Sequence, residues 1–325
     1  MKNLSFLILI VVVLDVDAQS TKGITGEKDT SFTNHRAYIS TLKTHPNIQL
    51  VEEYISDSVT ENRRLPYCVL PGRRLELDKF ESSFKRTAPA TAIVIVHGGG
   101  WRTGDRTQHY PLAQRLAALG YICFTVEYRL STEELYPAGL HDIKAAIRWI
   151  RLNAAAFNID TNKIAVLGFS AGGELAAMMG ATNGKPEFEK MNCNKGQSSR
   201  VDAVIDIDGT LSFVHPESGE GDDSKSTSAA TYWFGYAKKD NPELWKQASP
   251  LTHVGKHTPP TMFLNSAVAR MHAGRTDFIN ILNQSNIYSE VHEFEGAPHS
   301  FILFDPWFDP SVKYVDGFLK KIFSK

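Results

Sequence analysis

The 325-residue sequence contains few cysteines and almost no net charge. Its 35 Lys and Arg residues nearly balance 36 Asp and Glu residues, so the formal net charge is −1. A chain this close to neutrality gives no reason to expect nucleic acid or an anionic membrane as a partner. The three cysteines have no zinc-ligand spacing. Cys123 lies in an apolar run typical of a buried side chain, whereas Cys68 and Cys193 are able to pair in an oxidising compartment.

The sequence shows no internal repeat, and its N-terminal apolar run is too short to span a bilayer. That run extends only from Phe6 to Leu14, whereas a membrane-spanning helix needs about 20 residues. Lys2 precedes it, and Val16-Asp17-Ala18 resembles a small-x-small cleavage site. We therefore expect residues 1–18 to be a signal peptide, with no membrane anchor, and the protein to be periplasmic or secreted.

Composition favours one large domain behind a polar lead-in. Hydrophobic residues make up 42% of the chain, enough for a full core, and α/β domains of this length are common. Residues 19–46 are polar, and we expect a poorly ordered lead-in there. Residues 47–325 then form the domain, with an insertion at 213–256 over the active site. The aromatic residues at 232–236 either offer a surface on which a sugar stacks or pack the insertion.

Short apolar runs alternate with segments of helical periodicity along the domain. This alternation predicts an α/β fold with a mostly parallel central sheet, helices on both faces and the insertion after the sixth strand. A turn at Pro71-Gly72 interrupts the second strand. The expected strands are 48–55, 67–77, 92–96, 121–128, 163–167, 204–209, 261–264 and 290–294, and the expected helices are 108–119, 141–157, 174–179 and 312–323.

The sequence Gly168-Phe169-Ser170-Ala171-Gly172 lies between an expected strand and an expected helix. Gly-x-Ser-x-Gly in this context is typical of a nucleophile elbow, in which a tight turn lifts a serine hydroxyl above the sheet edge. Glycines flank the serine because side chains there would clash with the crowded backbone. The helix that follows favours negative charge at its N-terminus. We therefore predict that Ser170 is a nucleophile rather than an ordinary loop residue.

A second glycine-rich segment, His97-Gly98-Gly99-Gly100-Trp101, follows an expected central strand. Glycines at a strand end allow backbone N–H groups to approach a reacting carbonyl. Such a loop upstream of the elbow is where an oxyanion hole is expected. We predict that the amides of Gly99, Gly100 and Ala171 hold the oxyanion.

A serine nucleophile needs a neighbouring base, and position in the chain selects one of the 11 histidines. His299 follows the last expected strand, and serine, acid, histidine is the usual chain order on this fold. We therefore predict that His299 is the base. This mechanism requires neither a cofactor nor a metal ion.

These motifs resemble the α/β-hydrolase superfamily, in its carboxylesterase and hormone-sensitive-lipase-like branch. The resemblance rests on His97-Gly98-Gly99-Gly100, on 168–173 and on Pro298-His299-Ser300-Phe301, and it extends from about Pro66 to the C-terminus. More narrowly, the chain resembles secreted bacterial carbohydrate esterases that remove acetyl, feruloyl or methyl groups from plant polysaccharides. The segments 206–209, 270–275 and 306–308 resemble a subgroup that includes pectin esterases.

The acid of the triad is the one departure from the family pattern. The family usually places it soon after the strand that carries Phe263, but residues 265–270 contain no carboxylate. Some relatives take it from the end of the preceding strand, which implies Asp208. Asp277 is the alternative, although it is expected in the first turn of a helix, where the helix dipole already favours it. Asp206 is the third choice and is better explained as structural.

Basic residues occupy the loop that lacks the acid. We predict that substrate is bound by Arg270, His272 and Arg275, together with Trp101. The arginines suit an anionic substrate, because arginine pairs bidentately with carboxylates such as those of methylated polygalacturonate. Alternatively, the cations are solvated or pair with acids such as Asp208. The sequence thus predicts a secreted serine esterase acting on pectin methyl esters or acetyl esters. A peptidase or amidase of the same fold and a catalytically silent binding module are the competing hypotheses.

Overall fold

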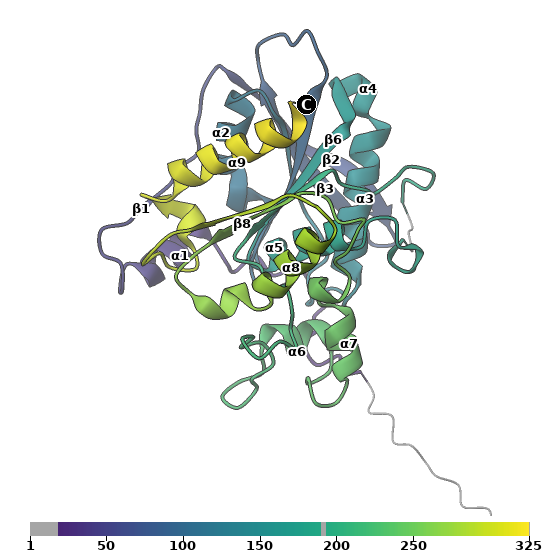
Figure 1. The fold of residues 1–325 in the computed structure, drawn as a ribbon, viewed down its shortest axis with the longest axis vertical. Helices are drawn as coiled ribbons and strands as arrows, with labels where there is room; N and C mark the ends of the chain where they lie inside the picture. The colour runs from purple at the N-terminus through teal and green to yellow at the C-terminus, as the bar shows by residue number, and fades with distance from the viewer. Residues whose placement is uncertain (1–18, 190–192, 325) are drawn as a thin grey trace, which may run out of the picture.

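The computed structural model describes residues 19–189 and 193–324, and its central element is an eight-stranded sheet (Figure 1). The strand order is β2-β3-β5-β4-β6-β7-β8-β9, and β1 and β10 form a separate two-stranded sheet. The expected signal peptide at 1–18 lies outside the described residues. The strands are β1 Gln49–Leu50, β2 Val59–Leu70, β3 Arg73–Ser82, β4 Ala90–Val96, β5 Ile122–Val126, β6 Ile159–Phe169, β7 Ala203–Ile207, β8 Thr261–Asn265, β9 Ser289–Glu293 and β10 Phe304–Asp305.

Antiparallel pairing is confined to one edge of the large sheet. β2 pairs with β3 and β3 with β5 in antiparallel register, whereas every pairing from β5 through β4 to β9 is parallel. All residues of β5, β7 and β8 are buried, as expected for parallel strands covered on both faces. The predicted mostly parallel α/β sheet is therefore confirmed.

Helices cover both faces of this sheet. In Figure 1, α2 and α9 lie on one side and α3 and α5 on the other. One large apolar cluster packs the sheet against α3 and α5, and a second packs it against α2 and α9. Among the described residues, no helix is both long and apolar enough to cross a membrane. The helices are α1 Asn34–Thr41, α2 Tyr110–Ala118, α3 Ala138–Leu152, α4 Ala154–Phe157, α5 Ala171–Ala181, α6 Ala229–Phe234, α7 Pro242–Gln247, α8 Arg275–Gln284 and α9 Phe308–Phe323, with 3-10 turns η1 Arg106–His109, η2 Pro186–Phe188, η3 Pro250–Thr252, η4 Ala269–His272 and η5 Phe301–Leu303.

The insertion follows β7, the sixth strand of the large sheet in chain order, and contains α6 and α7 at the bottom of Figure 1. Its aromatic residues mostly pack the insertion. Trp233, Phe234 and Trp245 are each no more than 1% exposed, and the rings of Phe234 and Trp245 lie 4.7 Å apart. Within the segment 232–236, Trp233 and Phe234 fit the packing interpretation, whereas Tyr232 and Tyr236 are half-buried.

Two predictions near the N-terminus are wrong. The lead-in at 19–46 is ordered: the Gln19 side chain donates to Phe234 O, the Thr25 amide donates to Thr132 O, and α1 lies within it. Backbone hydrogen bonds to distant loops, which local polarity does not reveal, hold this segment in place. The strand expected at 48–55 is reduced to β1. The interruption expected at Pro71-Gly72 is confirmed, because β2 and β3 form a hairpin that turns there.

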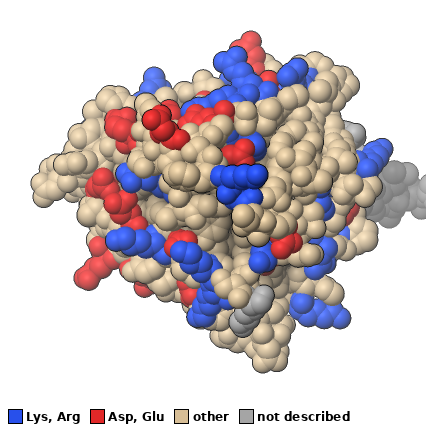
Figure 2. All heavy atoms as spheres, turned by 90° about the horizontal axis from the view of Figure 1, so that it is seen from above, with Lys and Arg blue, Asp and Glu red and all other residues tan. Residues whose placement is uncertain are grey.

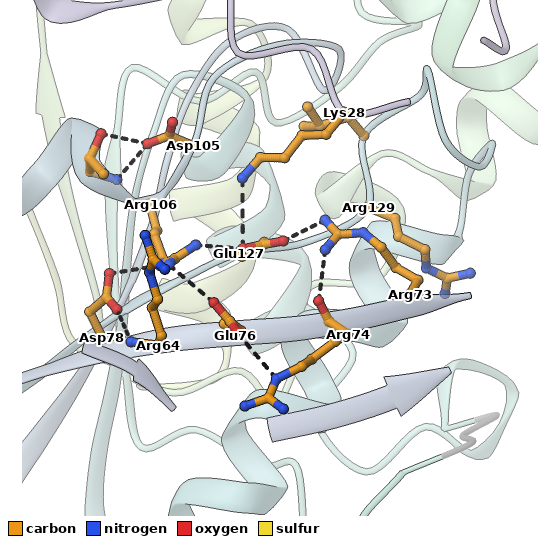
Figure 3. Close-up of polar contacts among 12 residues, drawn as sticks. Lys28, Arg64, Arg73, Arg74, Glu76, Asp78, Asp105, Arg106, Glu127 and Arg129 are labelled. Carbon is orange, nitrogen blue, oxygen red and sulfur yellow. Dashed lines mark hydrogen bonds and ion pairs between the residues drawn. The ribbon is translucent and has the colours of Figure 1, made fainter. Parts of the chain in front are cut away.

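An ion-pair network connects the lead-in, the antiparallel edge of the sheet and the loop after β4 (Figure 3). Arg106 donates to Asp78 and Glu127 over 2.7 and 2.6 Å, and Lys28 of the lead-in lies 3.7 Å from Glu127. Because Asp78 is fully buried, loss of its cationic partner would leave a buried charge uncompensated. On the face of the molecule shown in Figure 2, basic and acidic residues are interspersed.

Candidate active site

Ser170 lies in a strained turn between β6 and α5. Its φ and ψ are 56° and −120°, a conformation that non-glycine residues adopt at a cost and that is common at functional sites. Glycines make the turn possible. A Cβ on Gly168 would lie 1.8 Å from Gly172 O, and a Cβ on Gly172 would lie 2.2 Å from Val96 O. The expected nucleophile-elbow geometry is therefore present.

Hydrogen bonds connect Ser170 to His299 and His299 to Asp208. The Ser170 hydroxyl oxygen is 2.8 Å from His299 Nε2, and His299 Nδ1 is 3.0 Å from Asp208 Oδ2. The imidazole is thus oriented by a carboxylate on one side and faces the hydroxyl on the other. This is the arrangement in which a histidine removes a proton from serine.

Asp208 follows β7 in a left-handed conformation, with φ of 52°. Its Oδ1 accepts from the Ser266 amide at 2.8 Å and from the Asn265 side chain at 3.3 Å, and His272 Nε2 lies 3.5 Å away. Burial acts to raise the pKa of Asp208, but the adjacent His272 imidazole and hydrogen bonds from His299 and Ser266 hold that pKa well below its usual range. The carboxylate is therefore ionised beside His299.

The structure separates the other two acids from His299. Asp277 lies in the first turn of α8, as expected, where its carboxylate is exposed and 3.5 Å from His215. Asp206 is buried and accepts from the Gly209 amide at 2.7 Å. A Cβ on Gly173 or Gly209 would lie within about 2.5 Å of Asp206 Oδ1, so this side chain fills a tight space behind the elbow. Of the three acids considered, only Asp208 contacts His299 in the described residues.

The loop after β4 presents unpaired amides next to the elbow. Gly99 and Gly100 have positive φ values of 122° and 60°, and a Cβ on Gly99 would lie 1.9 Å from Thr103 O. The Gly98 amide already donates to Gln108 Oε1, whereas those of Gly99 and Gly100 donate to no atom of the described residues. Ala171 is the first residue of α5, where an amide has no partner within its helix. These three N–H groups are free to donate hydrogen bonds to an oxyanion.

His97 anchors the start of this loop and takes no direct part in the triad. Its Nδ1 lies 2.8 Å from Gly98 O, and its ring stacks on Tyr128 with centroids 4.5 Å apart. Burial lowers the pKa of His97 to about 4, so the ring is neutral at physiological pH.

Trp101 fixes the loop against the elbow helix. Its indole N–H donates to Glu174 Oε2 at 2.9 Å, and its ring stacks on Trp233 at 4.7 Å. Trp101 is only 5% exposed, and it lines the pocket that contains Ser170. Glu174 is fully buried, and this burial, reinforced by the nearby Asp206 charge, raises its pKa well above the usual range despite the Trp101 hydrogen bond.

A pocket of about 180 Å³ opens beside the triad, and both the insertion and η4 contribute to its wall. A larger hollow of about 580 Å³ lies between 44–49 and 305–307 but contains no triad residue. The described residues contain no group of His, Cys, Asp or Glu side chains arranged to hold a metal ion. The residues lining the smaller pocket are Gly100, Trp101, Ser170, Ala171, Thr210, Glu220, Ala229, Arg270, Met271 and His299.

Two of the three basic residues predicted to bind substrate support the acid. Arg275 Nη1 donates to Asn265 Oδ1 at 2.6 Å and lies 2.6 Å from Glu293 Oε1. His272 lies against Asp208. Neither residue lines the pocket beside Ser170, and their contact with substrate stays a prediction. Arg270 does line the pocket.

Glu220 is a charged pocket residue that sequence reasoning missed. It lies in the insertion, where Ser218-Gly219-Glu220-Gly221 has the composition of an ordinary turn. The two flanking glycines are the only local signal of a constrained backbone, and they do not indicate what the carboxylate faces.

The sheet, the elbow and the order Ser170, Asp208, His299 define an α/β-hydrolase. The chain belongs to the BD-FAE family, whose model matches residues 80–271, more than half of the sequence. The matched range includes the elbow and Asp208 but ends before His299.

Named relatives agree with this assignment. Esterase LipC of Mycobacterium tuberculosis is 30% identical over 70% of this chain and 57% of its own length, and the probable carboxylic ester hydrolase LipM of the same organism is 28% identical over 67% and 51%. The chain therefore spans about half the length of the curated relatives it matches. A truncated carbohydrate esterase from gut microbiota has the same fold, with a TM-score of 0.70 and 23% identity over 84% of this chain and all of that one.

Proposed function

We propose that this protein is a serine-dependent carboxylic ester hydrolase. The observation that carries the proposal is the hydrogen-bonded series from Ser170 through His299 to Asp208, with free amides beside it. The names of LipC and LipM, an esterase and a probable carboxylic ester hydrolase, support it.

The geometry supports a two-step acyl transfer. Ser170 Oγ attacks the ester carbonyl carbon while His299 Nε2 takes the hydroxyl proton, and the carbonyl oxygen becomes an oxyanion held by the amides of Gly99, Gly100 and Ala171. Collapse breaks the bond to the alcohol, which leaves with the proton from His299. A water molecule then attacks the acyl-enzyme by the same route, releasing the carboxylic acid and restoring Ser170.

For the substrate, we propose an acetyl ester on a plant polysaccharide or one of its oligosaccharides. The small pocket suits a short acyl group, and a carbohydrate esterase shares this fold. The carboxylate of Glu220 partly offsets the charge of Arg270 in the same pocket, which favours a neutral sugar over a uronate. The methyl ester of pectin is the second candidate, because the Arg270 side chain is 53% exposed and able to meet a polymer carboxylate.

We also propose that the protein is exported after removal of residues 1–18. The Cys68–Cys193 disulfide supports this proposal, because such bonds persist in oxidising compartments. N-terminal sequencing of protein recovered outside the cytoplasm should begin at Gln19, and an intact N-terminus there would contradict it.

A substrate panel with a nucleophile variant tests the activity. Wild-type protein should hydrolyse p-nitrophenyl acetate and release acetate from acetylated xylan faster than methanol from methylated pectin. Ser170→Ala should lose about a millionfold in turnover and lose labelling by a serine-reactive phosphonate. A tenth of wild-type activity in Ser170→Ala would refute the nucleophile, cleavage of peptide bonds alone would favour an amidase, and no turnover of any substrate would favour a binding module.

A further inference from the structure

Glu220 places a carboxylate in the wall of the pocket that contains Ser170 and His299. Its side chain is 17% exposed, and its Oε1 lies 3.5 Å from Arg270 Nη1. This contact is at the limit of a hydrogen bond, so the pair leaves both groups with unused hydrogen-bonding capacity. A carboxylate and a guanidinium therefore face the same small space beside the nucleophile.

The backbone around Glu220 is built to hold it there. A Cβ on Gly219 would lie 3.2 Å from Arg270 Cδ, so the arginine stem packs directly on that glycine. Gly221 has a φ of 78°, and a Cβ there would lie 2.7 Å from Lys238 Cε and 2.8 Å from the Trp245 ring. The backbone on both sides of Glu220 is therefore closely packed against neighbouring side chains.

From this juxtaposition we infer that Glu220 and Arg270 form a subsite that binds hydroxyl groups of the sugar carrying the ester. The inference rests on the proposed ester hydrolase and adds the residues that recognise the alcohol part of the substrate. Glu220 accepts hydrogen bonds from sugar hydroxyls, and Arg270 donates to hydroxyl or ring oxygens.

The charges around the pair disfavour other ligands. A uronate carboxylate would meet Arg270 only at the cost of repulsion from Glu220. An ammonium group near Glu220 would be repelled by two cations, Arg270 and Lys238. Both lie close enough to lower the pKa of Glu220. Burial raises this pKa, and these charges and that of His299 oppose the rise. A neutral polyol supplies both donors and acceptors without adding charge.

The test compares two acetyl esters that differ in the alcohol. Acetylated xylotriose presents sugar hydroxyls, whereas the leaving group of p-nitrophenyl acetate has none. Glu220→Gln keeps the side-chain size and removes the charge. We expect the ratio of kcat/KM on acetylated xylotriose to that on p-nitrophenyl acetate to fall at least about tenfold, mainly through KM, because hydrogen bonds to charged groups are the stronger ones. Unacetylated xylotriose should also inhibit the variant at least about tenfold more weakly.

Asp222→Asn is the matched control, because Asp222 is an exposed carboxylate two residues away that accepts from the Ser224 amide. It should leave the ratio within twofold of wild type. Equal losses of Glu220→Gln on both esters, or an unchanged ratio, would overturn the subsite. If the wild type cleaves p-nitrophenyl acetate but no acetylated sugar, the proposed carbohydrate substrate fails first, and the subsite with it.

Discussion

At the level of single residues, the chemistry of this site depends on which carboxylate orients His299. Asp208 is held by hydrogen bonds from Asn265, Ser266 and His299, and Arg275 donates to the side-chain oxygen of Asn265. Supporting contacts of this kind fix a catalytic geometry that the triad alone would leave loose.

Replacement of Asp208 and of Asp277 by asparagine should therefore have unequal effects. Asp208→Asn should lower kcat on p-nitrophenyl acetate by roughly ten-thousandfold, because the histidine loses the partner that selects its productive tautomer. Asp277→Asn should change kcat by less than twofold, since this side chain contacts only His215 among the described residues. Equal effects in stopped assays of the two purified variants would contradict the assignment.

Glu174 makes a prediction about stability and pH. Its pKa is raised by burial, so the folded protein keeps a proton that the unfolded chain loses above about pH 4.3. The folded state then binds more protons, and wild-type stability falls with rising pH until the folded-state pKa is reached. Glu174→Gln removes this pH dependence. The free energy of unfolding of the variant relative to that of the wild type should therefore rise by up to about 1.4 kcal/mol per pH unit above pH 4.3.

Urea unfolding between pH 4 and pH 8 measures this difference. Glu243→Gln, at an exposed position in α7, is the control and should show a smaller pH dependence relative to wild type. A Glu174→Gln difference that stays constant across the range would mean that Glu174 is ionised in the folded protein.

At the level of elements, the elbow joins β4, β6 and α5 through backbone contacts that only glycine permits. Gly172 approaches both Val96 O and His97 O, the residues that lead into the loop carrying Gly99 and Gly100. The nucleophile and its oxyanion donors are thereby held at a distance set by main-chain packing. The same contact packs the two glycine motifs against each other.

Gly172→Ala should therefore damage both stability and turnover. Its Cβ would lie 2.2 Å from Val96 O and 2.6 Å from His97 O, so the helix and the loop must separate, at a cost of about 1–3 kcal/mol or more. The melting temperature and kcat should both fall. Gly317→Ala is the matched control, because nothing lies within 4 Å of its Cβ position in α9. It should raise stability by about 0.5–1 kcal/mol, and equal behaviour of the two variants would contradict the packing argument.

At the level of the whole molecule, the Cys68–Cys193 disulfide connects β2 with the segment before β7 across 125 residues of sequence. A crosslink over so long a loop removes conformational freedom mainly from the unfolded chain, and the chain-entropy model gives about 4–5 kcal/mol. Reduction should therefore lower the urea midpoint of the wild type.

The double variant Cys68→Ala/Cys193→Ala separates this effect from general damage by the reductant. It should unfold at the midpoint of the reduced wild type, and dithiothreitol should shift it no further. An unchanged wild-type midpoint after verified reduction would show that the unfolded chain is not constrained by this bond.

The sequence alone determined the features that depend on neighbouring residues. Apolar runs and helical periodicity predicted the parallel sheet, and Gly168 to Gly172 predicted the elbow, because a tight strand-to-helix turn requires glycine at particular positions. The order of elements also singled out His299 among the histidines. Each of these inferences uses backbone constraints that act over a few residues.

Tertiary structure decided the features that depend on long-range partners. Asp208 and Asp277 were separable only by which one reaches His299, a contact across 91 residues. Arg275 and His272 were expected either at the substrate or paired with acids such as Asp208, and only the fold shows Asn265 beside Arg275 and Asp208 beside His272. Glu220 and the ordered lead-in were missed for the same reason: each owes its position to packing against segments that are distant in sequence, and side-chain type alone does not encode that distance.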